Sequence, residues 1–105
     1  MKRYLLTPEA QGDLEHIVEY IRVEAGASRA ARVLSEIRGA FRKLAGMPGM
    51  GHFREDLLDE HYKFWTVYSY VIVYRWEVRP IQIIAVIHGA RDLAALFAHR
   101  KRRLR

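Results

Sequence analysis

The sequence has 105 residues, the size of a single globular domain, so a second core is excluded. It contains no cysteine, which excludes disulfides and thiolate metal sites, and no run of about twenty apolar residues that could cross a bilayer. The formal net charge is +6, but five positive charges lie in the last six residues. We therefore expect a soluble cytoplasmic protein with a nearly neutral body and a basic tail over residues 99–105.

The first part of the chain predicts a short strand followed by a helical hairpin. Lys2–Leu6 can form the strand, and Thr7 before Pro8 is typical of a helix start, because threonine caps the first turn and proline fits its first position. Gly26 separates the two helices, and Ser28 is the expected cap of the second. Apolar residues recur at helical spacing on one stripe of each helix: Ala10, Leu14, Ile17, Val18 and Ile21, and then Ala30, Val33, Leu34, Ile37, Phe41 and Leu44.

Three aromatic and β-branched runs in the second part predict strands. Gly46 followed by Pro48 ends the second helix, and the irregular loop after it has room for one helical turn at Asp56–Asp59. The three runs are Tyr62–Tyr68, Tyr70–Trp76 and Ile81–Ile87. Because the gaps between them are too short for helical crossovers, these strands must run antiparallel.

The two faces of the expected sheet need different partners. The helical hairpin can cover one face, and the central run is apolar or aromatic at nearly every position. We therefore expect the opposite face to show aromatic surface to solvent or to bind another molecule. Asp92 is the expected cap of a short terminal helix that ends at Phe97, before the basic tail begins.

Several segments, in order along the chain, resemble the RelE/ParE toxin superfamily. They are Leu6–Ala10 with Asp13–Ile21, Met47–Gly51, Tyr70–Arg75, and Ile84–Leu93. The last segment contains His-Gly-Ala-Arg-Asp, which is most similar to the ParE branch. The resemblance covers nearly the whole chain and implies an α+β fold, in which an N-terminal strand and a helical hairpin pack on one face of an antiparallel sheet and a short helix ends the chain. Residues 1–105 would then form a single toxin domain.

The resemblance also implies a toxin of a type II toxin–antitoxin pair, encoded beside a small ParD-like antitoxin. ParE-like members poison DNA gyrase, whereas RelE-like members cut messenger RNA on the ribosome. A shared fold does not decide between these activities. The leading hypothesis is a ParE-like toxin that binds gyrase. The alternatives are a RelE-like ribosome-dependent endoribonuclease and a catalytically inert binding module.

The candidate catalytic residues for RNA cleavage are Lys63, Arg75 and His88. Metal-free cleavage needs a base, an acid and cations for the charge on the phosphorane. Lys63 stands where the family usually has an arginine, and lysine lacks the bidentate fork that matches a phosphate. Ala85 stands where many relatives place another arginine, and no tyrosine follows Trp76. This set of nuclease residues is incomplete, which favours binding over catalysis. Each candidate can also have a structural role: His88 can form a hydrogen bond, and Lys63 and Arg75 can form ion pairs.

The expected contacts with other macromolecules lie on two surfaces. Gyrase is expected to contact the terminal segment, through Arg91, Arg100, Lys101, Arg102 and Arg103. The antitoxin is expected to cover an apolar groove between the hairpin and the sheet, folding as it binds, with contacts at Tyr20, Leu34, Arg38, Phe41 and Leu58. We expect no metal and no cofactor, because the histidines are dispersed and the chain has no glycine-rich phosphate loop.

Overall fold

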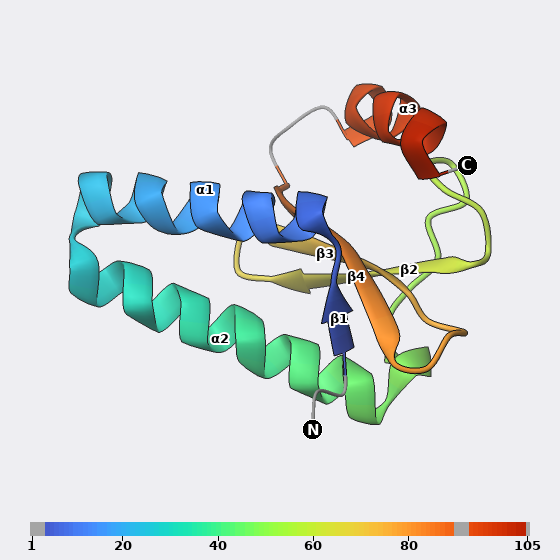
Figure 1. Ribbon diagram of the computed structural model, residues 1–105, viewed down its shortest axis with the longest axis horizontal. Coiled ribbons are helices and arrows are strands. Elements are labelled where there is room, and N and C mark those ends of the chain that lie inside the picture. Colours follow the sequence, from blue (N-terminus) through green and yellow to red (C-terminus); the bar gives the residue numbers. More distant parts are fainter. Residues whose placement is uncertain (1–3, 90–92, 105) are drawn as a thin grey trace.

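The computed structural model describes residues 4–89 and 93–104, and only the backbone of residues 99–104. Its elements are β1 (Tyr4–Leu6), α1 (Pro8–Ala25), α2 (Ala27–Gly46), the 3-10 turn η1 (Pro48–Met50), β2 (Tyr62–Val67), β3 (Tyr70–Arg75), β4 (Ile81–His88) and α3 (Leu93–Leu104). Figure 1 shows the hairpin of α1 and α2 on one side of the sheet and α3 on another. The expected α+β fold is confirmed.

The two long helices begin and end at residues with clear local reasons. The hydroxyl of Thr7 accepts a hydrogen bond from the backbone N–H of Ala10 at 3.2 Å, and Pro8 occupies the first turn, as expected. Gly26 ends α1 with a positive φ of 95°, which a residue with a side chain rarely adopts. The expected cap at Ser28 is wrong: α2 already begins at Ala27, and Gly26 precedes it without a side-chain cap.

The sheet is mixed, with strand order β1-β4-β3-β2. The antiparallel pairing of β2 with β3 and of β3 with β4 is confirmed. The expectation of a wholly antiparallel sheet is wrong, because β1 pairs with β4 in parallel, with Tyr4 opposite Ile81 and Leu6 opposite Ile83. Residues 7–80 separate these two strands, so no tight turn constrains their relative direction.

A β-bulge interrupts the pairing of β4 with β3. Tyr74 lies opposite Ile83, whereas the preceding residue Val73 lies opposite Ala85, so Ile84 is an extra residue in β4. A bulge of this kind shifts the alternation of side chains along the strand. As a result, Ile83 and Val86 belong to the core on one face of the sheet, while Ile84 and Ala85 belong to the core on the other.

The larger core lies between the hairpin and the sheet. The apolar stripes of α1 and α2 pack on the sheet residues Ile72, Tyr74, Ile83 and Val86. Most of the expected stripe residues are buried, while Ile17, Val18 and Leu34 are partly buried against the same cluster. The helical periodicity of the sequence therefore identified the inward faces of both helices.

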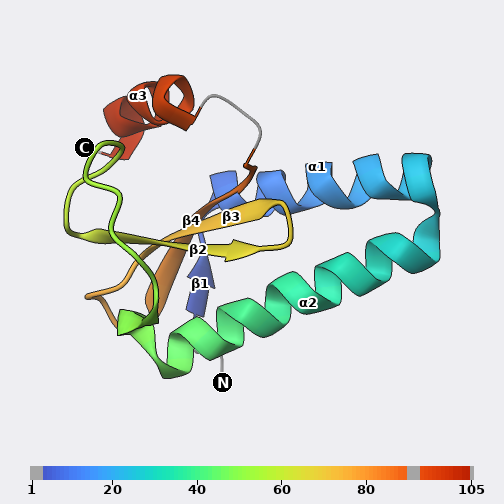
Figure 2. The same ribbon diagram turned by 180° about the vertical axis from the view of Figure 1, so that it is seen from behind.

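The opposite face of the sheet is also covered, contrary to the expectation of exposed aromatic surface. Leu57 and Leu58 from the loop before β2, together with Phe97 from α3, bury Phe64 and Val73. The rings of Phe64 and Phe97 meet edge to face at 5.7 Å. Figure 2 shows the loop and α3 on the side of the sheet away from the hairpin.

Two local features explain this second layer. The segment expected to hold a helical turn at Asp56–Asp59 forms only a hydrogen-bonded turn, in which the N–H groups of Leu57 and Leu58 donate to the carbonyl of Arg54 and bring both leucines onto the sheet. The terminal helix continues to Leu104 instead of ending at Phe97, so most of the expected basic tail is helical. The expected cap, Asp92, lies outside the described residues.

Candidate functional site

A groove runs between α1, the start of α2 and the adjoining ends of β3 and β4. It consists of two pockets, of about 400 and 660 Å³, that share Tyr20, Tyr70 and His88. We call it the His88 groove. The first pocket is also lined by Ile21, Glu24, Ala25, Arg29, Arg32, Val33, Tyr68 and Ser69, and the second by Gly12, Asp13, His16, Ile17, Val86 and Ile87. Both volumes are within the range of small-ligand sites.

The strand register brings the shared residues together. Because of the bulge at Ile84, His88 lies on the hairpin side of the sheet, directly opposite Tyr70 on β3. The two rings meet edge to face with their centroids 5.5 Å apart. Tyr20 approaches from α1 with 62% of its surface exposed. The centre of the groove is therefore aromatic and open to solvent.

The strand edge that borders the groove is protected by a side chain of α1. On the edge of β4 where β1 pairs, β1 ends at Leu6 opposite Ile83, and no other described strand neighbours β4 beyond that point. The carboxylate of Asp13 accepts a hydrogen bond from the N–H of Val86 at 2.9 Å, in the place of a strand partner. This contact satisfies one edge donor and holds α1 beside β4.

Tyr68 forms one lip of the groove in an unusual backbone conformation. It begins the two-residue turn between β2 and β3 with a φ of 55°, the left-handed region that bulky residues rarely adopt. Its side chain is 58% exposed. A hydrogen bond with Glu36 of α2 raises the pKa of the Tyr68 hydroxyl, since it favours the neutral form.

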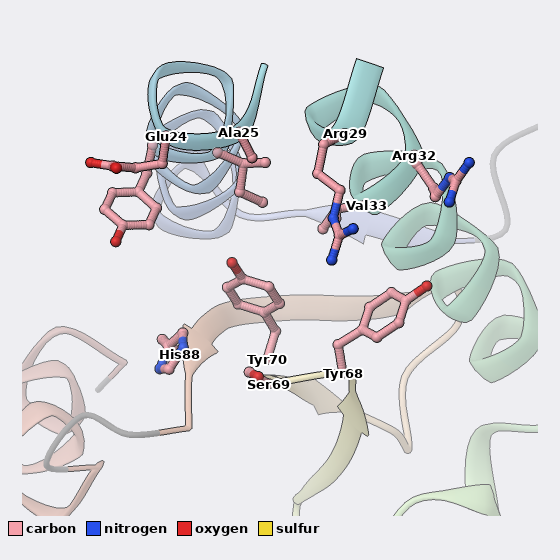
Figure 3. A pocket seen from close by; sticks show the side chains of 11 residues that line it. Glu24, Ala25, Arg29, Arg32, Val33, Tyr68, Ser69, Tyr70 and His88 are labelled. Atoms are coloured by element: carbon pink, nitrogen blue, oxygen red, sulfur yellow. The ribbon is translucent and has the colours of Figure 1, made fainter. Parts of the chain in front are cut away.

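Two arginines from the first turns of α2 lie above the tyrosines. Arg29 and Arg32 are three residues apart and line the first pocket together. Figure 3 shows the guanidinium of Arg29 reaching from α2 toward Tyr70, with Arg32 beside the rim near Tyr68. Within the part of the chain that the structure describes, neither guanidinium has an ion-pair or hydrogen-bond partner.

The candidate catalytic residue Lys63 is occupied by a structural role. Only 8% of its surface is exposed, and its Nζ donates hydrogen bonds to the carbonyls of Gly49 at 3.1 Å and Gly51 at 3.3 Å. The same nitrogen lies over the rings of Phe53 and Trp76, at 4.3 and 4.7 Å from their centroids. The cation therefore holds the loop around η1 against the sheet.

The three catalytic candidates do not meet in one site. Lys63 lies opposite Tyr74 on β3, and His88 lies opposite Tyr70, about 13 Å away along the same strand. Arg75 follows Tyr74 and so projects from the other face of the sheet, where it is exposed. Ala85 is fully buried in the second core.

The five expected antitoxin contacts lie in three different environments. Tyr20 lines the His88 groove, while Leu34 and Arg38 line a shallow pocket of about 220 Å³ between α1 and α2. Phe41 and Leu58 are 0% and 1% exposed and belong to the two cores, so they are packing residues and not surface contacts. Their apolar character marked them for burial, and sequence spacing cannot distinguish burial by this chain from burial by a partner.

The expected gyrase contacts are on or beside α3. Arg100, Lys101, Arg102 and Arg103 fall within the helix, and Arg91 lies outside the described residues.

The described helices were also compared with the length and apolar character that a membrane span requires, and none of them meets both.

The sequence did not point to the arginine and tyrosine side of the His88 groove. A weak signal was present, because Arg29 and Arg32 are spaced to share a face beside the buried stripe of α2. Tyr68 was expected as the last residue of a strand, but β2 ends at Val67 and Tyr68 belongs to the turn. Their convergence depends on the angle between hairpin and sheet, which no local pattern encodes.

The comparisons with known proteins agree on one family. The family described as the ParE toxin of the type II toxin–antitoxin system parDE matches residues 4–93. The chain is 29% identical to Toxin ParE of Escherichia coli over 102 residues, covering 95% of this chain and 97% of that protein. It is 34% identical to Toxin ParE1 of Caulobacter vibrioides over 95 residues, covering 90% and 97%. A solved chromosomal ParDE system from P. aeruginosa has a similar fold, with a TM-score of 0.69 at 20% identity, covering 81% of this chain and 92% of that one.

Proposed function

Because the chain belongs to the ParE toxin family of type II toxin–antitoxin systems, we propose that it inhibits DNA gyrase by binding it and that a ParD-like antitoxin encoded beside it neutralises it. Two relatives that are named ParE toxins match at least 90% of this chain, which supports the toxin role. The solved neighbour is a ParDE system, which supports an antitoxin partner. The proposed target places the action in the cytoplasm.

The observation that carries the binding mechanism is the separation of the catalytic candidates. RNA cleavage without a metal needs its acid, base and cations around one phosphate. Here the Nζ of Lys63 is bonded to two carbonyls, and Arg75 projects from the opposite face of the sheet. No single phosphate can contact both side chains in this arrangement, which disfavours the RelE-like alternative.

The test measures both activities with the purified chain. Supercoiling of relaxed plasmid by DNA gyrase should fall as the chain is added, and cleaved DNA should accumulate if the toxin traps gyrase on its substrate. Message bound to translating ribosomes should stay intact at the same concentrations. Cleavage of the message that disappears in His88→Ala or Arg75→Ala would instead establish the endoribonuclease. Failure of both assays, without toxicity on expression, would leave an inert binding module.

The antitoxin part has its own test. The open reading frame next to this gene should encode a short DNA-binding protein, and co-expression of that protein should restore growth and gyrase activity. A toxic chain that no neighbouring product neutralises would contradict this part of the proposal while leaving the target open.

A further inference from the structure

The two helices of the hairpin carry opposite net charges. α1 contains five carboxylates and one arginine, which gives −4, whereas α2 contains five cations and one carboxylate, which gives +4. None of the α2 cations makes an ion pair with a described residue, and the arginine of α1 pairs with Glu19 of its own helix. The charge of α2 is therefore not balanced by ion pairs within the described part of the chain. The five cations, all of them exposed, are Arg29, Arg32, Arg38, Arg42 and Lys43.

Four of these cations lie on the side of α2 that faces away from the rest of the molecule. Because successive residues of an α-helix are rotated by about 100°, Ser35 and Gly39 lie opposite the buried Ile37. Figures 1 and 2 show α2 along the border of the molecule, away from α3. We call this surface the basic face of α2. Its cations, on the two sides of Ser35 and Gly39, are Arg32 and Lys43, and Arg38 and Arg42.

The single carboxylate of α2 does not stand among these four cations. Glu36 lies nearer the sheet, where it is hydrogen-bonded with the hydroxyl of Tyr68 at the turn between β2 and β3. The basic face extends over about 17 Å of helix, from Arg32 to Lys43. The same length of duplex DNA carries about ten phosphate charges. The face therefore matches a short stretch of a phosphate backbone in sign and in length.

The surroundings of the cations favour duplex DNA over other acidic partners. None of the large apolar side chains that are exposed in the described chain belongs to α2. A protein partner is anchored by apolar and aromatic contacts, and a helix on a membrane surface buries an apolar face in the lipid. Single-stranded nucleic acid stacks its bases on aromatic side chains. The phosphates of a duplex need only cations and small polar donors, and the basic face of α2 offers these.

We infer that the basic face of α2 binds the phosphate backbone of duplex DNA, without reading the base sequence. The small residues Ser35 and Gly39 leave room for the backbone to approach the helix between the cations. The inference goes beyond the proposed function, because it concerns DNA itself and does not require gyrase. A toxin whose target acts on DNA would be held near that target by such a contact.

The test measures binding of the full-length chain to a labelled DNA duplex by fluorescence anisotropy. The probe has about 20 base pairs, and the potassium chloride concentration is varied from about 25 to 200 mM. The unchanged chain should bind two duplexes of unrelated sequence equally, with a dissociation constant of about 10–100 µM near physiological salt. The logarithm of the binding constant should fall with the logarithm of the salt concentration, with a slope of about −4 or steeper, since the basic end of α3 also attracts DNA.

Two double variants remove the cations of the basic face in pairs. Arg42→Gln with Lys43→Gln changes residues that line none of the pockets described here. This variant should bind the duplex about tenfold more weakly at about 50 mM salt, and its slope should be shallower by about 2, because each lost phosphate contact releases about one counterion fewer. Arg32→Gln with Arg38→Gln should have the same effect. Glutamine is a good helix former, and circular dichroism melts verify that both variants are folded.

Arg22→Gln with Arg54→Gln is the matched control. It lowers the net charge by the same amount, but these exposed arginines lie on α1 and in the loop before β2, where they pair with Glu19 and Asp56. The slope should change by less than about 0.5, since neither arginine belongs to the basic face. A control that weakens DNA binding as much as the α2 variants would show a general effect of net charge and overturn the inference.

Unchanged slopes for the two α2 variants would also overturn the inference. If the same variants then lost binding to the product of the neighbouring open reading frame, the basic face would be assigned to a protein partner instead. Tighter binding of single-stranded DNA than of the duplex would contradict the proposed geometry as well. These assays contain no gyrase, so a chain that binds DNA through α2 but leaves supercoiling unaffected would contradict the gyrase assignment alone.

Discussion

Two side chains from the sheet hold the loop that follows α2. The hydroxyl of Tyr74 donates to the carbonyl of Pro48 at 2.6 Å and accepts from the N–H of Gly51 at 3.0 Å. Lys63 binds the carbonyls on the same loop. The loop comes so close that a Cβ added at Gly51 would lie 2.5 Å from the Tyr74 oxygen. Both polar side chains are buried because the loop supplies their hydrogen bonds.

Replacing Tyr74 with phenylalanine tests this anchor. The ring stays, but the buried N–H of Gly51 and the carbonyl of Pro48 lose their partner, so Tyr74→Phe should lower the free energy of unfolding by about 1–3 kcal/mol. Urea denaturation at neutral pH measures this difference. Tyr62→Phe is the control, since Tyr62 is half-buried and no hydrogen bond of its hydroxyl is seen among the described residues; a change below about 0.5 kcal/mol is expected there.

The same tyrosine should make stability depend on pH in alkaline solution. Burial raises the pKa of Tyr74 above its ordinary value of 10.0, against a smaller opposing effect of the hydrogen bond from Gly51. The neutral hydroxyl is therefore favoured in the folded state. The resulting stabilisation is present below pH 10.0 and is lost as pH rises through the folded pKa. The difference in unfolding free energy between the unchanged chain and Tyr74→Phe should therefore shrink as the pH rises above 10.0. A difference that stays constant with pH would contradict this prediction.

Lys63 gives a prediction that separates a structural from a catalytic role. Lys63→Met keeps the aliphatic length but leaves the carbonyls of Gly49 and Gly51 without their donor, so the free energy of unfolding should fall by about 2–3 kcal/mol. Gyrase inhibition, measured well below the melting temperature, should persist. A variant with unchanged stability and abolished activity would instead make Lys63 a functional residue.

At the residue level, the sequence showed which side chains could take part in chemistry, but not which groups surround each of them in the fold. It identified Lys63, Arg75 and His88 as polar residues on strands that one face of a sheet could expose together. Whether they share a site depends on which face each occupies and on the loop that comes back over β2. The bond from Lys63 to Gly49 spans 14 residues, and no pattern within either segment encodes it.

At the level of elements, local signals predicted the structure well and long-range pairing poorly. The hairpin and three strands follow from periodicity, caps and β-branched runs, which act within a few residues. The parallel pairing of Leu6 with Ile83 joins distant parts of the chain, and a three-residue strand has too few side chains to specify it. The extension of α3 to Leu104 was missed because a dense basic run was interpreted as a tail, although arginine and lysine are good helix formers.

The groove face of α1 can be tested with two mid-helix glycines. Gly12 lines the larger pocket, and a Cβ added there meets no atom within 4 Å. Gly12→Leu should fold normally, with slightly higher helix propensity, but should obstruct the groove and weaken binding of the neighbouring gene product at least tenfold. Gly39→Leu on α2 is the matched control, because only the end of Arg42 lies near its added Cβ, at 3.8 Å. Equal affinity of both variants would exclude this part of the groove from the interface.

At the scale of the whole molecule, the chain forms three layers, with the sheet between the hairpin and the layer made by the loop and α3. The hairpin buries one face of the sheet, and the loop with α3 buries the other. Among the described residues, the His88 groove and the basic end of α3 are two surfaces that remain open to partners. The sequence could predict a hairpin on a sheet, but not that a short helix and two leucines would close the second face, because Phe97 reaches Phe64 across 33 residues.

A truncation separates the two roles of α3. A chain that ends after Ala98 keeps Phe97 over the sheet and removes Arg100, Lys101, Arg102 and Arg103. We expect its melting temperature to fall by only a few degrees, since the apolar contacts remain, while gyrase inhibition is lost with the basic residues. Phe97→Ala is the complementary variant and should cost about 3–5 kcal/mol through the cavity it creates. Full gyrase inhibition by the truncated chain would show that the gyrase contact lies outside the removed residues.

The extra residue at Ile84 has a consequence for how this protein can vary. Side chains along a strand alternate between the two faces of the sheet. A bulge that takes up one extra residue therefore reverses the alternation for the residues that follow it. If the same residues formed a regular strand without the bulge, the imidazole of His88 would turn beneath α3 and the side chain of Ile87 would point at the helices. A homologous chain that lacks the residue at position 84 could therefore form a regular strand with the same faces, whereas one that keeps this residue but loses the bulge would turn the end of the strand over and close the opening beside Tyr70.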